Sequence, residues 1–198
     1  EEAGAVCLDK ETRETLCNSA VALAKAVNYC GAGTLEYLYD EATNEFFFIE
    51  MNTRIQVEHP ISEMITGVDL VQEMIRVCGG AKLSLTQDQI HRNGHAIEVR
   101  INAEDPLMQF MPWPGKLEKM SVPEGEGIRF DHFLYEGYQI PPFYDSLLGK
   151  VIVHAPTRAE AITKLKSVLE RIKFKGLKTT IPLHLALAND ASVQESAF

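Results

Sequence analysis

Two β-like runs separated by a short polar segment restrict the fold more than any other feature of the sequence. Residues Thr34–Tyr39 and Glu45–Met51 are rich in aromatic and branched side chains, and Asp40–Asn44 between them has the composition of a turn. Strand-like runs joined by so short a segment predict an antiparallel hairpin. A hairpin pairs the residues of its two strands, so its register decides which polar side chains face each other.

The remaining chain combines helical and strand-like periodicities. His95–Asn102 alternates strictly between apolar and polar side chains, as a strand buried on one face does. Short strand-like runs follow it and two helical stretches close the chain, so the sequence predicts the α+β class. The expected helices cover residues 11–30, 70–78, 158–173 and 181–188, and the further expected strands cover residues 116–121, 128–133 and 148–154.

Charge is unevenly distributed along the chain. The 198 residues carry a formal net charge of −9, which argues against a nucleic-acid binder. Residues 1–90 hold 15 acidic and 6 basic side chains, whereas residues 91–198 hold 13 of each. We place a domain boundary near residue 90, where this charge change meets the polar segment Thr86–Gln89. The acidic part suits a divalent cation such as Mg²⁺, or a basic partner.

The hairpin predicts a pair of facing carboxylates. If its turn centres on Thr43, Glu36 of the first strand lies across from Glu50 of the second. Facing carboxylates destabilise a strand pair unless a cation lies between them. Hard cations such as Mg²⁺ take oxygen ligands, and the amide of Asn52 offers one more. We therefore interpret Glu36, Glu50 and Asn52 as a metal site.

Every second residue after Ile49 is polar. In an extended chain five of these side chains point to one face: Glu50, Asn52, Arg54, Gln56 and Glu58. A solvated strand face is the alternative. Two features disfavour it. The row lacks lysine, and because it follows the apolar residues 46–49 directly, we expect its start to be buried. Arg54 then offers a cation for a small anion, and Glu58 offers a carboxylate for proton transfer.

This region resembles the catalytic signature of biotin carboxylases. These ATP-grasp enzymes serve acetyl-CoA, propionyl-CoA, methylcrotonyl-CoA and pyruvate carboxylases. The resemblance covers nearly the whole chain and implies the C-terminal part of an ATP-grasp domain at 1–90, followed by the biotin carboxylase C-terminal domain at 91–198. The matching segments are GAGTLEY at 31–37, FIEMNTRIQVEHP at 48–60, EVRINAEDP at 98–106, PGK at 114–116 and PPFYDS at 141–146.

The resemblance implies a ligase that uses MgATP to phosphorylate bicarbonate. The carboxyphosphate yields CO₂, which carboxylates biotin attached to a carrier domain. By motif position, Glu58 is the base that deprotonates bicarbonate, and Arg100 binds biotin and stabilises its enolate. The resemblance implies three further groups: bicarbonate-binding residues Arg54, Gln56, Val57 and Glu58; ATP-binding residues Glu36, Leu38, Ile49 and Glu50; and metal ligands Glu36, Glu50 and Asn52. Arg54 joins Glu58 and Arg100 as a catalytic residue.

Cofactors and partners follow from the same resemblance. The implied cofactors are ATP, Mg²⁺ or Mn²⁺ and bicarbonate, with carrier-bound biotin as substrate. The implied partners are the biotin carboxyl carrier domain, a carboxyltransferase subunit or domain, and a second copy of the enzyme in a homodimer. Four scattered cysteines without a C-x-x-C motif favour free thiols in a reducing compartment. We expect the bacterial cytoplasm or, in a eukaryote, the mitochondrial matrix.

One departure from the family pattern bears on activity. The phosphate-covering glycine-rich loop and the ATP-binding lysines of the family have no counterpart in these residues. We therefore expect this chain to be inactive alone. Two other functions remain open: another ATP-grasp ligase of the carbamoyl-phosphate type, and a non-catalytic fragment kept for subunit assembly. Arg100 and the Q-V-E-H continuation favour biotin, and the intact polar row disfavours the second alternative.

Two residues near the row receive a structural or an open interpretation. His59 falls on the face opposite Glu58 and precedes Pro60, so we interpret it as structural. Asp145 either orients Arg100 through a salt bridge or belongs to a turn.

Overall fold

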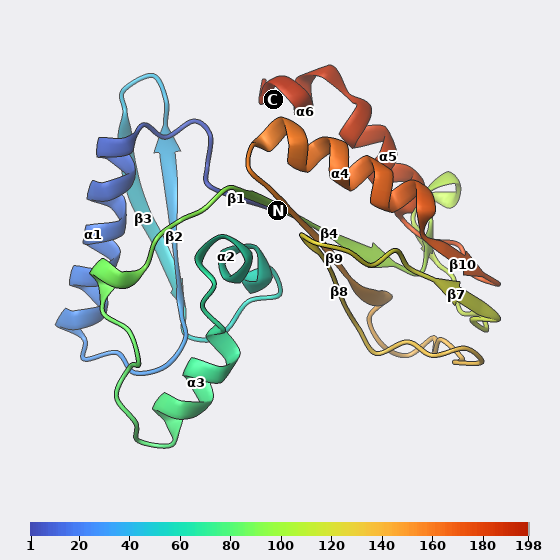
Figure 1. Cartoon of the computed structure of the whole chain (residues 1–198), viewed down its shortest axis with the longest axis horizontal. Coiled ribbons are helices and arrows are strands. Elements are labelled where there is room, and N and C mark those ends of the chain that lie inside the picture. Colours follow the sequence, from blue (N-terminus) through green and yellow to red (C-terminus); the bar gives the residue numbers. More distant parts are fainter. Residues whose placement is uncertain (198) are drawn as a thin grey trace. The chain divides into compact units, whose positions relative to one another are not determined.

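The computed structural model describes residues 1–197 and divides into two compact units (Figure 1). One unit is Gly4–Arg92, and the other joins Glu1–Ala3 to the residues from Asn93 onward. Helices and antiparallel strands follow one another in both units, which confirms the expected α+β class. No helix in residues 1–197 is long and apolar enough to cross a membrane.

The first unit contains one long helix, a hairpin and two short helices. Its elements are α1 (Lys10–Ala26), β2 (Thr34–Asp40), β3 (Glu45–Asn52), α2 (His59–Thr66), α3 (Leu70–Cys78) and the 3₁₀ helix Gln87–Gln89. Asp69 caps α3, because its carboxylate accepts from the backbone N–H of Gln72 at 2.8 Å. The sequence placed the end of α1 at residue 30, but Asn28 has a positive φ of 51° and breaks the helix earlier.

The hairpin of β2 and β3 is covered on one side only. Tyr37 faces α1, where its hydroxyl lies 3.0 Å from that of Ser19, and its ring packs edge-on against Phe46. Leu38 is 64% exposed and Phe47 is 55% exposed. The expectation that the polar row starts in a buried segment is wrong, because Ile49 is 50% exposed and Glu50 is exposed as well. A two-stranded sheet has two faces, and α1 lies along the one that carries Tyr37.

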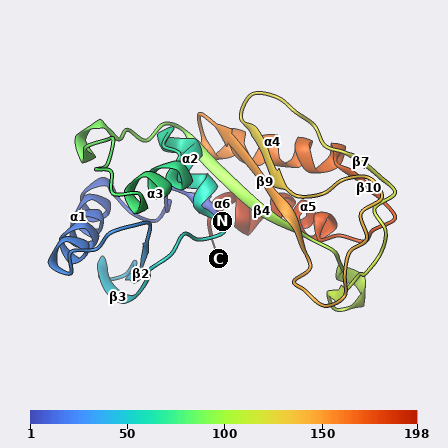
Figure 2. The same cartoon turned by 90° about the horizontal axis from the view of Figure 1, so that it is seen from below.

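The second unit is built on a four-stranded antiparallel sheet with the order β1-β4-β9-β8. α4 packs against β4 and β9, and α5 packs against α4 (Figure 2). The strands of the sheet are β1 (Glu2–Ala3), β4 (His95–Asn102), β8 (Ile128–His132) and β9 (Leu147–Ala155), and the helices are α4 (Arg158–Arg171), α5 (Ile181–Asn189) and α6 (Ala191–Glu195). Shorter elements are β5 (Glu104–Asp105), the 3₁₀ helix Pro106–Met108, β6 (Met111–Pro112), β7 (Lys119–Ser121) and β10 (Lys173–Lys175).

Alternation along the strands gives this sheet two different faces. Ile101, Val151 and Val153 are fully buried and form one core cluster with Leu165 and Val168 of α4. On the opposite face, charged side chains of the three strands lie beside the fully buried Ile152, which pairs with Glu98. Helix α4 covers the apolar face.

Candidate functional site

Glu36 and Glu50 lie directly across from each other in the hairpin, which confirms the alignment expected from the sequence. A β-bulge produces this alignment. Tyr37 pairs with Phe48, but Glu36 pairs with Glu50, so Ile49 is an additional residue on β3. Bulges of this kind re-aim the side chains that follow them. Without the bulge, Glu36 would face Ile49, and the two carboxylates would not meet.

Two side-chain amides join the carboxylate pair. Asn52 Nδ2 donates to Oε1 of Glu36 at 2.7 Å and to Oε1 of Glu50 at 3.2 Å. Gln56 Nε2 donates to the same oxygen of Glu36 at 3.2 Å. These neutral donors leave the negative charge of the pair in place. In residues 1–197, no three His, Cys, Asp or Glu side chains gather closely enough to hold a metal ion, so a metal here would need the amide or a bound ligand as well.

The polar row leaves the strand after Asn52. The expectation of one extended face through Glu58 is wrong beyond this point, because β3 ends at Asn52, Arg54 lies in a bend and the chain turns at Val57 and Glu58. The bend keeps the row together: Arg54 Nη2 donates to Oδ1 of Asn52 at 3.5 Å. Arg54, Gln56 and the carboxylate pair therefore form one polar cluster by folding back, not by alternation.

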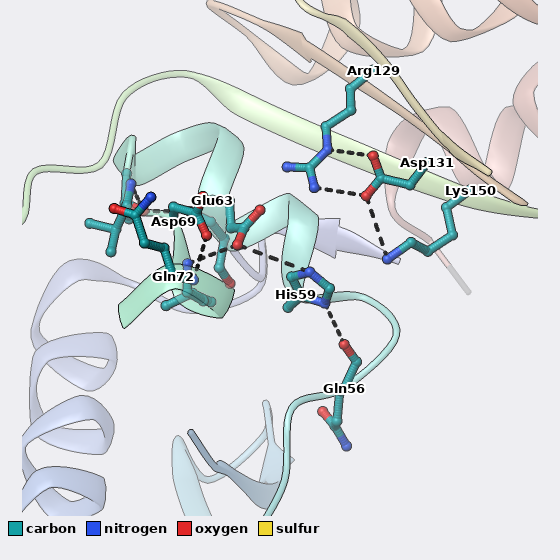
Figure 3. Close-up of polar contacts among 12 residues, drawn as sticks. Gln56, His59, Glu63, Asp69, Gln72, Arg129, Asp131 and Lys150 are labelled. Carbon is teal, nitrogen blue, oxygen red and sulfur yellow. Dashed lines mark hydrogen bonds and ion pairs between the residues drawn. The ribbon is translucent and has the colours of Figure 1, made fainter. Parts of the chain in front are cut away.

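Helix α2, which the sequence analysis missed, begins directly after this turn. The carbonyl of Gln56 accepts from the backbone N–H of His59 at 3.3 Å, and the Nδ1 atom of His59 lies 2.7 Å from the same oxygen. Nε2 of His59 lies 4.0 Å from the carboxylate of Glu63, as Figure 3 shows. Glu63 is buried and also accepts from the backbone N–H of Leu70 at 2.8 Å. His59 thus contacts the turn itself, which supports its structural interpretation.

Arg100 lies on β4 of the second unit and forms an ion pair with Glu1 at 2.7 Å. Its backbone carbonyl accepts from Oγ1 of Thr180 at 3.2 Å and lies 2.8 Å from Nε2 of His184. Burial lowers the pKa of His184, so its imidazole is neutral at pH 7 and donates through Nε2–H. Asp145 accepts from the backbone N–H of Leu147 at 2.8 Å, which favours the turn interpretation.

A row of charged side chains crosses the sheet beside Arg100. Lys150 of β9 pairs in register with Arg100 on one side and with Asp131 of β8 on the other. Asp131 accepts from Arg129 at 2.7 Å and lies 3.8 Å from Nζ of Lys150 (Figure 3). This row was not predicted from the sequence. Strand alternation could have indicated it only if the pairing of β4, β9 and β8 were known.

Glu98 is the buried member of the polar face. It precedes Arg100 by two residues on β4 and is fully buried. Neither carboxylate oxygen has a hydrogen-bond partner. Burial raises the pKa of Glu98 to about 7, against the opposing effect of Lys150. The sequence predicted an exposed polar face for β4, but the Glu98 side chain on that face is fully buried.

Leu38 and Ile49 are exposed apolar side chains on the hairpin that carries the carboxylate pair. Leu38 lies two residues from Glu36, and Ile49 is the additional residue of the bulge, 50% exposed. Exposed apolar side chains beside a polar cluster can pack against the flat face of a ring-shaped ligand. Their placement is compatible with contacts to a nucleotide base.

Two sequence models of known families match the chain. The biotin carboxylase C-terminal domain matches residues 98–198, and the ATP-binding domain of the carbamoyl-phosphate synthase L chain matches residues 1–86. The first match covers about half of the chain and includes Glu98 and Arg100. The second covers the hairpin, the bend and helices α2 and α3.

Full-length relatives and solved structures agree with these matches. Biotin carboxylase 1 of Bacillus subtilis is 50% identical over 94% of this chain, and biotin carboxylase of Nostoc is 53% identical over 93%. The chain spans 42% and 41% of these two proteins. A crystal structure of the biotin carboxylase domain dimer of Hydrogenobacter thermophilus 2-oxoglutarate carboxylase, with MgADP and bicarbonate, is 46% identical.

That crystal structure aligns with all of this chain at a TM-score of 0.95, and the alignment covers 43% of the crystallised chain. The sequence model that matches residues 98–198, the curated relatives and the solved structure lead to the same family. The chain therefore belongs to the biotin carboxylase family, of which it contains the end of the ATP-grasp region and the C-terminal domain.

Proposed function

We propose that the full-length protein containing these residues carboxylates biotin on a carrier domain, using MgATP and bicarbonate. The observation that carries this proposal is the hydrogen-bonded cluster that joins Glu36 and Glu50 to Asn52 and Gln56. It places a candidate metal site beside a candidate anion site, as phosphoryl transfer to a small anion requires. We also propose that residues 1–90 and 91–198 are the two domains concerned.

The donor set fits Mg²⁺ or Mn²⁺. Both cations prefer oxygen ligands, and Mg²⁺ is commonly held by one or two carboxylates together with substrate phosphates. Glu36 and Glu50 supply the carboxylates, and a half-turn of the Asn52 amide would direct its oxygen toward them. A cation bound there would neutralise charge on the ATP phosphates during transfer. The carboxylates alone repel each other, so a bound cation also stabilises the hairpin.

Bicarbonate binding is assigned to the bend and turn after β3. Arg54 supplies a planar guanidinium that suits a planar oxyanion, and Gln56 and the Val57 backbone supply further donors. Glu58 is assigned as the base that takes the bicarbonate proton. The deprotonated oxygen then attacks the γ-phosphorus of ATP, the bond to the β-phosphate oxygen breaks, and ADP leaves. Leu38 and Ile49 are assigned to the nucleotide base.

Biotin activation is assigned to Arg100. Carboxyphosphate splits into CO₂ and phosphate, and this phosphate takes the proton of the ureido nitrogen. The negative charge left on the ureido oxygen is stabilised by a guanidinium at that oxygen. The ion pair with Glu1 and the two contacts on its carbonyl fix the position of Arg100 on β4. CO₂ from carboxyphosphate then bonds to the nitrogen.

We propose the partners and the compartment on the same basis. A carrier domain presents biotin, a carboxyltransferase uses the product, and a second copy forms a homodimer. The bacterial cytoplasm, or the mitochondrial matrix in a eukaryote, stays a prediction. The 198 residues alone should release no phosphate from ATP, because they contain no glycine-rich phosphate loop.

The specific alternative is an ATP-grasp ligase of the carbamoyl-phosphate type, which the match at residues 1–86 makes the natural competitor. The match of residues 98–198 to the biotin carboxylase C-terminal domain favours biotin. A fragment kept for assembly is disfavoured by the intact cluster around Glu36.

Phosphate release from MgATP tests the proposal. The full-length enzyme is assayed with bicarbonate, with and without free biotin, as wild type and as Glu58→Gln. We expect biotin-stimulated release that collapses in Glu58→Gln. Release that needs bicarbonate but ignores biotin would replace the proposal by the carbamoyl-phosphate alternative. No release from the wild type would leave the assembly role.

A further inference from the structure

The peptide bond between Gln56 and Val57 is held by a side chain outside the cluster. Gln56 to His59 is a β-turn, closed by the 3.3 Å hydrogen bond from the His59 N–H to the Gln56 carbonyl. Glu58 has φ −83° and ψ 6°, which match the third position of a type I turn. The His59 imidazole adds a second contact to the same carbonyl, at 2.7 Å from Nδ1.

This second contact fixes the tautomer. A carbonyl oxygen only accepts, so Nδ1 carries the hydrogen and donates it. Nε2 lies 4.0 Å from the carboxylate of Glu63, beyond hydrogen-bond distance. The short contact at Nδ1 is therefore the one that holds the imidazole against the turn (Figure 3).

Because a peptide unit is planar, a contact that holds the Gln56 carbonyl also affects the backbone of Val57. The Gln56 carbonyl and the Val57 N–H belong to one planar peptide unit. The bond is trans, as is every peptide bond in residues 1–197, so the N–H points opposite to the carbonyl. Fixing the oxygen of Gln56 therefore fixes the direction of the Val57 N–H, the backbone donor assigned to bicarbonate.

We infer that His59 is a positioning residue that aims the Val57 N–H at bicarbonate. The inference rests on the proposed function and deepens it, since it adds a residue that touches no substrate. A backbone N–H stabilises an anion best when its direction is already fixed before the anion binds. His59 provides this hold from the first turn of α2.

Substitutions at His59 separate positioning from folding. His59→Ala removes the donor, and His59→Asn keeps one, because the Asn amide nitrogen can take the place of Nδ1. His91→Ala is the matched control, since His91 is an exposed histidine of the same unit. The full-length enzyme is assayed for kcat and for the KM values of bicarbonate and ATP, and its thermal unfolding is followed.

We expect His59→Ala to raise the KM for bicarbonate about tenfold, the effect of one well-placed hydrogen bond. The KM for ATP should stay within about twofold, and His59→Asn should recover most of the loss. A rise in both KM values together with a lower unfolding temperature, or no recovery in His59→Asn, would overturn the inference.

A crystal structure of each variant gives a readout besides activity. The peptide plane at Gln56–Val57 should be reoriented in His59→Ala and preserved in His59→Asn. An unchanged plane in His59→Ala would overturn the inference even if activity changed. Absence of any bicarbonate-dependent release from the wild type would instead overturn the proposed function, and the crystal structures would still decide the role of His59.

Discussion

Glu98 and Arg100 point to the same face of β4, but only the carboxylate is fully buried. Arg100 reaches Glu1, whereas the oxygens of Glu98 have no hydrogen-bond partner. Transfer of a charged carboxylate from water into such a site is costly, and this cost raises the pKa of Glu98 to about 7. The sheet thus places a carboxyl group that binds a proton near neutral pH next to the arginine assigned to biotin.

This raised pKa predicts how stability depends on pH. The native state binds the Glu98 proton more tightly than the unfolded state, whose pKa is near 4.5. The free energy of unfolding should therefore fall as pH rises between about 4.5 and 7, by on the order of 3 kcal/mol from this group. Denaturant unfolding of the full-length protein across this range measures the slope.

Glu98→Gln supplies the control for that experiment. The amide has the shape of the protonated acid and no charge, so the part of the slope that comes from Glu98 should disappear. Above pH 7 the variant should be more stable than the wild type. Equal slopes in the two proteins would contradict a raised pKa.

The facing carboxylates predict an effect of metal on the hairpin. Glu50→Gln should raise the Mg²⁺ concentration that gives half-maximal activity by at least about tenfold, because one charged ligand is lost. Without metal, the same change should stabilise the protein slightly, by about 0.2–1 kcal/mol, because the repulsion from Glu36 is removed. Metal titrations of activity and of the unfolding temperature check both signs.

Glu41→Gln is the matched control for Glu50→Gln. Glu41 is an exposed residue of the hairpin turn, and its substitution removes the same charge from the same unit. It should leave the metal dependence unchanged. A similar shift in both variants would point to the overall charge of the unit and not to a metal site.

How far the sequence predicted this site depends on the kind of contact. Hairpin register is local, but the register set at the turn would place Glu36 opposite Ile49, and the expected alignment with Glu50 arises only through the bulge, for which we recognised no sequence signal. The bend at Arg54 was missed because alternation predicts extension and is silent about where a strand stops. Contacts between distant strands, such as Lys150 with Asp131, depend on sheet topology, and alternation within one strand does not contain that information.

The core cluster on the apolar side of the sheet should contribute much of the stability of the second unit. Leu165 is 4% exposed and packs in the core cluster under the sheet. Leu165→Ala removes buried methyl groups and leaves a cavity, so the free energy of unfolding should fall by about 2–5 kcal/mol. Leu107→Ala is the control, because Leu107 is 89% exposed and its loss should have little effect. Equal losses in the two variants would show that Leu165 does not belong to a packed core.

The assignment of Arg100 to biotin predicts that carboxylation of biotin can be separated from cleavage of ATP. Arg100→Lys keeps a positive charge but loses the planar fork of the guanidinium, which pairs with Glu1 here and suits two-point contact with an oxyanion. Biotin stimulation of phosphate release should therefore fall by about a hundredfold, the usual effect of removing one transition-state donor. Slow bicarbonate-dependent release without biotin should persist, because Arg54 and Glu58 are unchanged. Arg76→Lys, on the exposed side of α3, is the matched control and should keep full stimulation. If Arg100→Lys lost both rates together, Arg100 would act on bicarbonate or on folding, and its assignment to biotin would be wrong.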